Sequence, residues 1–133
     1  MKSSLFNLLI FLIFSYNLVA QEKTMEESQK NGKTIYTNFC AVCHMADGKG
    51  VGRTFPPVAQ ADFLLDKRVE SIKTIKFGVQ GPMKVNGVTF NSSMMPMGLK
   101  DEEIADVMNY MLNTWGNKDP KMVTPQEVAN IKE

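Results

Sequence analysis

Apolar residues fall at helical spacing in three separate stretches of this chain, and the first stretch begins near Ser28. Ile35 and Phe39 lie four residues apart on one helical face. Gly32 and Tyr36 repeat this spacing on a neighbouring face. Because a glycine inside a helix costs about 1 kcal/mol relative to alanine, Gly32 needs a packing reason. We therefore expect another helix to approach the backbone closely at Gly32, with Tyr36 at the edge of that contact.

The second stretch predicts a helix that follows a short helical turn. Residues 62–66 favour the turn, and Asp66 is the expected N-cap of the helix after it. The apolar stripe of this helix, which we interpret as core packing, consists of Val69, Ile72 and Ile75. Gly78 marks its end.

The third stretch carries the longest apolar stripe. Three acidic residues at positions 101–103 put negative charge at its start, where the helix dipole favours it. The stripe consists of Ile104, Val107, Met108, Met111, Leu112 and Trp115, followed by Gly116 as the C-terminal cap. We expect this helix to be the main partner of the first one, so that Val107 and Tyr110 meet Gly32 and its aromatic neighbour.

Two weaker patterns complete the local prediction. Residues 85–90 contain the turn dipeptide Asn86-Gly87 and indicate a small hairpin. Residues 117–133 are polar and contain two prolines, which predicts an extended cover over the surface with one helical turn from Pro125.

The N-terminus has the composition of an export signal. Met1 and Lys2 precede an apolar run over residues 5–14, which ends in the small-residue sequence Leu18-Val19-Ala20. We expect residues 1–20 to be a signal peptide that is cleaved after Ala20. The apolar run is shorter than the roughly 20 residues that span a bilayer. An uncleaved anchor that uses everything up to Ala20 is the alternative.

The rest of the chain is long enough for one domain with one core. Residues 21–27 are polar and predict a flexible leader. Because Lys2 leaves with the signal, the formal charge falls from +1 to 0. This balance gives no basic excess for binding nucleic acid and does not identify a partner.

The pentapeptide Cys40-Ala41-Val42-Cys43-His44 is the strongest chemical motif of the chain. Two cysteines with two residues between them and a histidine directly after form the attachment pattern of a c-type haem. The thiols can add to the porphyrin vinyl groups as thioethers, and the imidazole can bind the iron from one face. The chain has no other cysteine and no other histidine.

Three other interpretations of this motif each leave a feature of the chain unexplained. A structural zinc site needs four cysteine or histidine ligands, and the chain supplies three. A thioredoxin-like motif would follow a strand, whereas the residues before Cys40 have a helical pattern. A plain disulfide between Cys40 and Cys43 suits an exported protein but leaves the adjoining His44 unexplained.

Two loops could complete a haem site. Phe55-Pro56-Pro57-Val58 offers free carbonyl groups, and Pro57 is our candidate acceptor for the second ring N–H of His44. The alternative is that this segment is only a rigid turn. Met94-Met95-Pro96-Met97-Gly98 places three thioethers outside any helical stripe, which favours a ligand role over core packing.

Taken together, these motifs make the chain resemble a class I cytochrome c over roughly residues 28–117. The resemblance rests on Gly32-Lys33-Thr34-Ile35-Tyr36, the pentapeptide, Phe55-Pro56-Pro57-Val58, Met95-Pro96, Asp101-Glu102-Glu103-Ile104-Ala105-Asp106-Val107-Met108-Asn109-Tyr110 and Trp115-Gly116-Asn117. The chain looks most similar to bacterial monohaem cytochromes and to cytochrome domains that are fused to nitrite reductases or serve dehydrogenases.

The resemblance implies an all-α cytochrome c fold in which the first and last helices cross and one haem c, with its iron, lies in an apolar crevice. It implies attachment at Cys40 and Cys43, with His44 and a methionine as axial ligands. Met95 occupies the family's position, and Met94 is the alternative. Residues 28–117 would form the cytochrome c domain, and residues 118–133 a C-terminal extension.

If both axial positions are filled, the iron has no open site for a substrate, so we expect an electron-transfer protein and not an enzyme. The expected function is one-electron transfer in the periplasm between redox partner proteins that dock at the exposed haem edge. We expect no membrane span after signal cleavage. The alternatives are a cytochrome subunit of a dehydrogenase or reductase complex, a haem enzyme or gas sensor with an open iron site, and a haem-free dithiol module.

Overall fold

The structure is a computed structural model that describes residues 23–133. The expected signal peptide at residues 1–20 and the beginning of the expected leader lie outside the described residues. Across residues 23–133, no helix has both the length and the apolar character that a membrane crossing requires.

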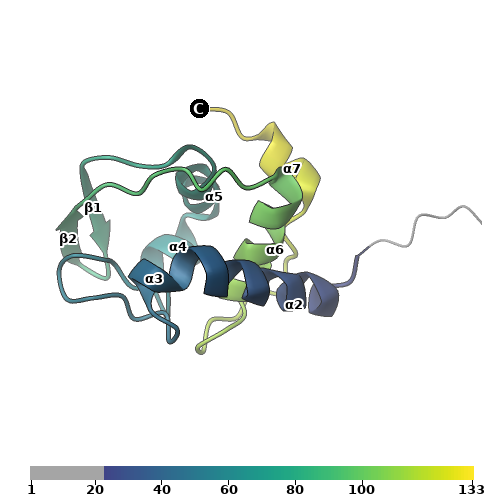
Figure 1. Cartoon of the computed structure of the whole chain (residues 1–133), viewed down its shortest axis with the longest axis horizontal. Helices are drawn as coiled ribbons and strands as arrows, with labels where there is room; N and C mark the ends of the chain where they lie inside the picture. The colour runs from purple at the N-terminus through teal and green to yellow at the C-terminus, as the bar shows by residue number, and fades with distance from the viewer. Residues whose placement is uncertain (1–22) are drawn as a thin grey trace, which may run out of the picture.

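Helices make up most of the regular structure, with one small hairpin among them (Figure 1). In chain order the elements are α2 (Met25–Ile35), the π-helical turn η2 (Tyr36–Cys40), α3 (Ala41–His44), α4 (Asp62–Asp66), α5 (Arg68–Phe77), β1 (Pro82–Val85), β2 (Val88–Asn91), α6 (Asp101–Met111) and α7 (Pro125–Asn130). The mostly helical fold predicted from the sequence is confirmed.

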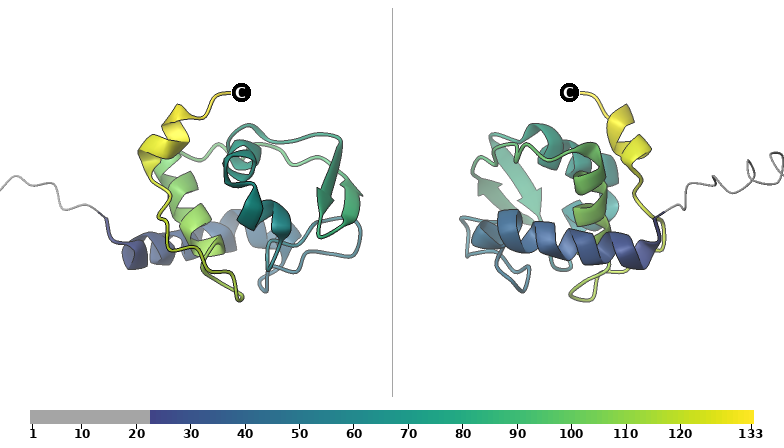
Figure 2. Two further views of the ribbon diagram at one scale, coloured as in Figure 1. Left: turned by 180° about the vertical axis from the view of Figure 1, so that it is seen from behind. Right: turned by 45° about the vertical axis from the view of Figure 1, so that its right-hand side comes forward.

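Helices α2 and α6 cross, as Figures 1 and 2 show, and Gly32 lies at the point of contact. A Cβ atom at Gly32 would lie 2.0 Å from the carbonyl oxygen of Asp106 and 2.8 Å from Cβ of Tyr110. Only a glycine permits so close an approach between two backbones. The ring of Tyr36 follows, with its centroid 5.5 Å from that of Tyr110. The close approach predicted at Gly32 is confirmed.

Helix α2 begins earlier than expected, at Met25. The side chain of Thr24 accepts a hydrogen bond from the backbone N–H of Glu27 at 3.2 Å and caps the helix. Residues 25–27, which the sequence analysis assigned to a flexible leader over residues 21–27, are therefore helical.

A chain of buried polar groups joins α2, α6 and the segment after α6. Lys23 forms an ion pair with Asp106, and the Ser28 hydroxyl donates to the same carboxylate at 2.6 Å. The buried Asn109 side chain donates to Ser28 Oγ and to the carbonyl of Val123, both at 2.9 Å. It also accepts from the N–H of Val123 at 2.7 Å. These bonds fix the α2–α6 crossing and attach the C-terminal segment to it.

The junction between α4 and α5 differs from the prediction. Asp66 is the last residue of α4, and Lys67 precedes α5 without any side-chain cap. The Ser71 hydroxyl donates to the carbonyl of Phe63 at 3.0 Å and ties the two helices together. The prediction that Asp66 caps the second helix is wrong, because that residue belongs to the preceding helix.

The predicted hairpin is confirmed. Asn86 and Gly87 have φ angles of 48° and 78°, as both central residues of a type I′ turn require. β1 and β2 pair antiparallel on either side of this turn. Asn86 and Asp62 each donate a backbone N–H to the other's side chain, at 2.7 and 2.9 Å, which anchors the turn to α4.

Helix α6 is shorter than predicted, and the chain after it folds back over the core. The helix ends at Met111, and Trp115 adopts a φ of 55°, which no α-helix allows. Val123 and Val128, which follow, are 0% exposed. The predicted helical turn is present as α7. Residues 118–133 therefore contribute to the core as well as covering the surface.

Arg68 at the start of α5 holds this C-terminal segment. Its guanidinium donates to both carboxylate oxygens of Glu127 at 2.7 and 2.9 Å, and to Asp119 at 2.9 Å. It also donates to the backbone carbonyls of Lys121 and Met122, each at 3.0 Å. Bidentate pairing of this kind is stronger and more directional than a single ion pair.

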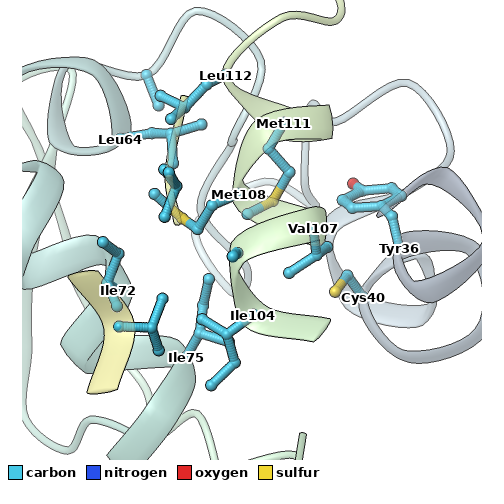
Figure 3. Packing of buried hydrophobic residues seen from close by; sticks show 14 of the residues in the cluster. Tyr36, Cys40, Leu64, Ile72, Ile75, Ile104, Val107, Met108, Met111 and Leu112 are labelled. Atoms are coloured by element: carbon cyan, nitrogen blue, oxygen red, sulfur yellow. The ribbon is translucent and has the colours of Figure 1, made fainter. Parts of the chain in front are cut away.

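The buried core lies where α5 and α6 meet the end of α2 (Figure 3). Val107 points from α6 toward Tyr36 and Cys40, while Ile72 and Ile75 approach from α5. Several members of the core, including Cys40, Ile75 and Met111, also line a cavity beside it. The core therefore forms one wall of the site.

Candidate functional site

A mainly apolar cavity of about 330 Å³ lies between α3, α5, the hairpin and the loop that follows β2. Its lining includes Cys40, Cys43, His44, the segment 55–58 and the methionines Met83, Met94, Met95, Met97 and Met111. The structure thus brings every predicted site residue to one cavity.

The two cysteines lie where the first helix ends. In the π-helical turn η2 the N–H of Ala41 donates to the carbonyl of Tyr36, a larger sequence separation than in an α-helix, and the turn leads directly into α3. Such π-turns are frequent at functional sites because the extra residue redirects the side chains that follow. Here they lead to Cys40 and Cys43, both of which line the cavity.

Both thiols are free within the described chain, so the disulfide interpretation receives no support. Burial, and then the neighbouring Cys43, raise the pKa of the Cys40 thiol to about 11. A dithiol redox motif works through a cysteine with a lowered pKa, because the thiolate is the nucleophile. The environment of Cys40 is the opposite of the one that such chemistry needs.

The imidazole of His44 is held by a backbone carbonyl. Its Nδ1 lies 2.8 Å from the carbonyl oxygen of Pro56, and since a carbonyl only accepts, Nδ1 must carry the proton. Burial lowers the pKa of His44, while the bond to Pro56 opposes this shift. The ring is therefore neutral at neutral pH, and Nε2 keeps a lone pair for a metal ion.

The acceptor is Pro56 and not Pro57, so the sequence-based assignment of Pro57 is wrong. The position of the segment is set by a hydrogen bond from Val58 N–H to the carbonyl of Gly48 at 2.8 Å. Gly50 lies against it, where a Cβ atom would come within 2.6 Å of the Pro56 carbonyl oxygen. Both prolines lack an N–H and offer a free carbonyl, so the sequence alone did not distinguish them.

Aromatic side chains hold the loop after His44 in place. The Tyr36 hydroxyl donates to the carbonyl of Met45 at 2.7 Å, and Trp115 Nε1 donates to the carbonyl of Ala46 at 3.1 Å. The two rings lie 4.9 Å apart between centroids and pack at a tilted angle. The aromatic cluster at the α2–α6 crossing thereby supports the histidine side of the cavity.

The methionine loop is attached to the chain that leaves α5. Val79 and Met94 exchange two backbone hydrogen bonds, each 2.9 Å long. A Cβ atom on Gly78 would lie 2.6 Å from the carbonyl oxygen of Met94 and 2.9 Å from Cδ of Pro96. Gly78, which the sequence marked only as a helix end, therefore permits this contact.

The three methionines of this loop differ in their surroundings. Met94 is half-buried and packs against the core, whereas Met95 is 62% exposed. Met97 is half-buried. All three side chains line the cavity, so the loop supplies several thioethers to the space that His44 also faces.

These donors fit a covalently attached haem. The cavity offers two thiols, one neutral imidazole and soft thioether sulfurs within an apolar wall, which is the ligand chemistry of c-type haem iron. Within residues 23–133, no three side chains of the His, Cys, Asp and Glu types gather to hold a bare metal ion. The described chain therefore gives the zinc interpretation no ligand set.

Comparisons with known proteins agree with this site. The family model described as cytochrome c matches residues 29–115. Cytochrome c-552 of Thermus thermophilus is 36% identical over 114 residues, which cover 79% of this chain and 76% of that protein.

Two longer relatives are subunits of dehydrogenases. The cytochrome c subunit of the quinone alcohol dehydrogenase of Gluconobacter oxydans is 33% identical over 105 residues, covering 76% of this chain. The gluconate 2-dehydrogenase cytochrome c subunit of Pantoea cypripedii is 27% identical over 118 residues, covering 86% of this chain. The matches span only 22% and 27% of the length of these two subunits.

Proposed function

Because this chain belongs to the cytochrome c family, we propose that it carries single electrons in the periplasm with His44 and Met95 as the axial ligands of its haem iron. The family binds covalent haem c, and Cys40 and Cys43 fit its attachment motif. The observation that carries the proposal is the convergence of both thiols, the imidazole and the methionine loop on one apolar cavity.

His44 is suited to be the proximal ligand because its ring is oriented before any metal binds. The bond from Nδ1 to Pro56 fixes both the tautomer and the plane of the imidazole. It also makes Nε2 a better electron donor. Because Gly50 and the aromatic cluster hold the loop that carries Pro56, the ring needs little rearrangement when the iron changes charge.

Met95 is the better candidate among the three methionines of the loop. The side chain of Met94 is engaged in core packing, and its backbone is bonded in both directions to Val79. Met95 is 62% exposed, so its side chain is free to turn into the cavity, where ligation would also bury it. It also precedes Pro96, as in the family pattern.

The two proposed axial ligands and the apolar lining favour electron exchange as the chemistry of this site. Bound haem supplies a reversible one-electron change of its iron. If the His44 imidazole and the Met95 thioether hold the iron from its two faces, no position would stay open for oxygen, peroxide or a substrate. Thioether ligation and an apolar lining such as Phe63, Ile75 and Val79 disfavour the more charged ferric state and raise the reduction potential.

A periplasmic location is proposed from the signal-like residues 1–20. In the expected pathway, the chain is exported before haem is attached, so both cysteines must reach the attachment machinery reduced. The mass of the purified protein tests signal cleavage and haem attachment, because loss of residues 1–20 and addition of one haem each change the mass by a defined amount.

Optical spectroscopy tests the ligand set. Met95→Ala should keep the covalent haem but lose the weak charge-transfer band at the red end of the oxidised spectrum, and its reduction potential should fall. The matched control is Met97→Ala, which should leave both properties close to wild type. If Met95→Ala keeps the band and Met94→Ala loses it, the sixth ligand is Met94 and the assignment is wrong.

A second candidate is a cytochrome subunit of a dehydrogenase complex, which the names of two relatives favour. In that case the haem-stained protein should co-migrate with a dehydrogenase activity when detergent extracts of the source membranes are fractionated by size. A free carrier should elute at the size of its own short chain.

A further inference from the structure

A lysine-rich groove lies beside the cavity, between α5 and the first hairpin strand. Lys67, Lys73 and Lys84 line it, together with Glu70. Within residues 23–133, none of these three lysines forms an ion pair. All three lysine side chains are exposed, so their ammonium groups are free to turn toward an anion at the groove.

The groove and the cavity share a wall. Phe63, Thr74, Val79 and Met83 line both. The ammonium of Lys67 lies over the ring of Phe63, 5.4 Å from its centroid. This cation–π contact holds one positive charge at the shared wall.

Among the described residues that line the cavity, none has a lysine or arginine side chain. Apart from the thiols and His44, its polar side chains are the hydroxyls of Ser71, Thr74, Ser92 and Ser93. A haem c carries two propionate carboxylates, and carboxylates that leave water need a cation or several hydrogen bonds. Any cation that pairs with them must therefore come from outside the cavity lining.

The chemistry of the porphyrin limits where the carboxylates can lie. The propionates are on the edge opposite the vinyl-derived carbons, to which Cys40 and Cys43 would be bonded in a covalently attached haem. The carboxylate edge must therefore face away from α3. The wall shared with the groove comes from α4, α5, β1 and the chain between them, and no part of it comes from α3.

We propose that Lys67, Lys73 and Lys84 bind the haem propionates and form the cationic end of the haem site. Thr74, on the shared wall, adds a hydroxyl donor. The proposal rests on the proposed function, because it requires a haem in this cavity. A propionate carboxylate whose negative charge is compensated by a lysine stabilises ferric iron less than an unpaired carboxylate does. The three lysines therefore raise the reduction potential. Glu70, in the same groove, acts in the opposite direction.

The experiment uses the haem-loaded, exported protein. Lys67, Lys73 and Lys84 are changed together to glutamine, and Lys30→Gln and Lys118→Gln are the matched controls, since both lysines are exposed and neither lines the groove. Redox-induced infrared difference spectra are recorded with ¹³C in the propionate carboxyl groups, so that their bands are separated from those of the protein. Reduction potentials are measured on the same samples.

In the triple variant we expect the labelled carboxylate bands to shift and the reduction potential to fall. Both controls should match the wild type, and Glu70→Gln should raise the potential. Lys67→Arg, which keeps the positive charge, should retain most of the wild-type band positions.

Two results would overturn the proposal. Unchanged carboxylate bands with an unchanged potential would show that the propionates lie elsewhere. Unchanged carboxylate bands with a lowered potential would show that the lysines act on the iron only by long-range electrostatic interaction and do not contact the propionates. In either case the proposed function stands if the wild-type protein has covalent haem and the charge-transfer band of methionine ligation. A colourless wild-type protein would contradict the proposed function itself.

Discussion

The α2–α6 crossing and the cavity beside it differ in what completes them. At the crossing, Gly32 meets the backbone of Asp106 directly, and Asn109 satisfies polar groups of the two segments around it. Around the cavity, two thiols and several thioethers face an apolar space of about 330 Å³. The crossing is closed by contacts within the chain, whereas the cavity has the donors and the apolar lining that a haem requires.

This difference predicts that the two regions respond differently to substitution. Changes at the cavity should act on haem attachment and redox properties. Changes at the crossing should act on the free energy of unfolding and leave the haem spectrum of the folded protein unchanged.

The largest effect is expected for Cys43→Ala in the exporting host. Without the second thioether the haem is poorly retained, and the apolar cavity walls lose the group that fills them, so little mature holoprotein should accumulate. Haem staining after denaturing electrophoresis, together with immunoblotting of the periplasmic fraction, measures this. Wild-type amounts of folded, haem-free protein would show that the fold does not depend on the haem.

The next largest effect is expected for Gly32→Ala, on the free energy of unfolding. The new Cβ would lie 2.0 Å from the carbonyl oxygen of Asp106, so the two helices must separate. We expect a loss of about 3 kcal/mol in the free energy of unfolding, as for other overpacked sites. Guanidinium unfolding followed by circular dichroism measures it, with Asn31→Ala on the exposed face of α2 as the control. Equal stabilities of the two variants would contradict the close crossing.

Asn109→Ala should have an intermediate effect. It removes the side-chain partner of both backbone groups of Val123, and it removes one of the two hydrogen bonds of the buried Ser28 hydroxyl, which still donates to Asp106. Leaving such groups unpaired costs about 2 kcal/mol. The same unfolding experiment applies, with the exposed Asn130→Ala as the control. A loss no larger than that of the control would mean that water replaces the missing bonds.

The smallest effect is expected for Glu127→Gln, and it depends on pH. Hydrogen bonds from Arg68 hold the pKa of Glu127 below its ordinary value of 4.5. Since the folded-state pKa is depressed, the pair stabilises the protein above pH 4.5 and this stabilisation disappears as the pH falls through the folded-state pKa. The variant should be less stable than wild type by about 1 kcal/mol at neutral pH.

Unfolding curves from pH 7 to pH 3 test this linkage. The difference between wild type and Glu127→Gln should shrink toward the acid end. Glu133→Gln, at an exposed residue outside the Arg68 cluster, is the control and should show a small difference that does not change in this way. A difference that stays constant with pH would mean that the carboxylate charge contributes nothing.

The features that sequence reasoning predicted correctly are those with one local physical cause. Gly32 inside a helical pattern indicated a close approach of another helix, and the structure confirms it. Asn86-Gly87 indicated a two-residue turn, because both residues tolerate positive φ. The spacing of Cys40 and Cys43 indicated a covalent haem c, and the family that the chain belongs to binds this group.

The errors concern choices that depend on tertiary contacts. Pro56 and Pro57 are chemically equivalent as acceptors, and only the packing of the loop against Gly50 selects Pro56. Asp66 has the side chain of a cap but lies within α4, a boundary that propensity does not fix. Trp115 continues the apolar stripe of α6, yet its positive φ ends any helix before it.

The lysine groove is a different case, since its members lie far apart in the sequence among other lysines. Lys67 and Lys84 line the same groove only in the folded chain, where α4 packs against β1. A net charge of +1 for the whole chain gave no sign of this local concentration. Only the folded arrangement relates these cations to the site.

The central claim is that a porphyrin completes this fold through two covalent bonds, and the intact mass of the purified exported protein under denaturing conditions tests it most directly. The account predicts one species whose mass is that of residues 21–133 plus one haem. A mass equal to the polypeptide alone, from a colourless sample with two free thiols, would contradict it.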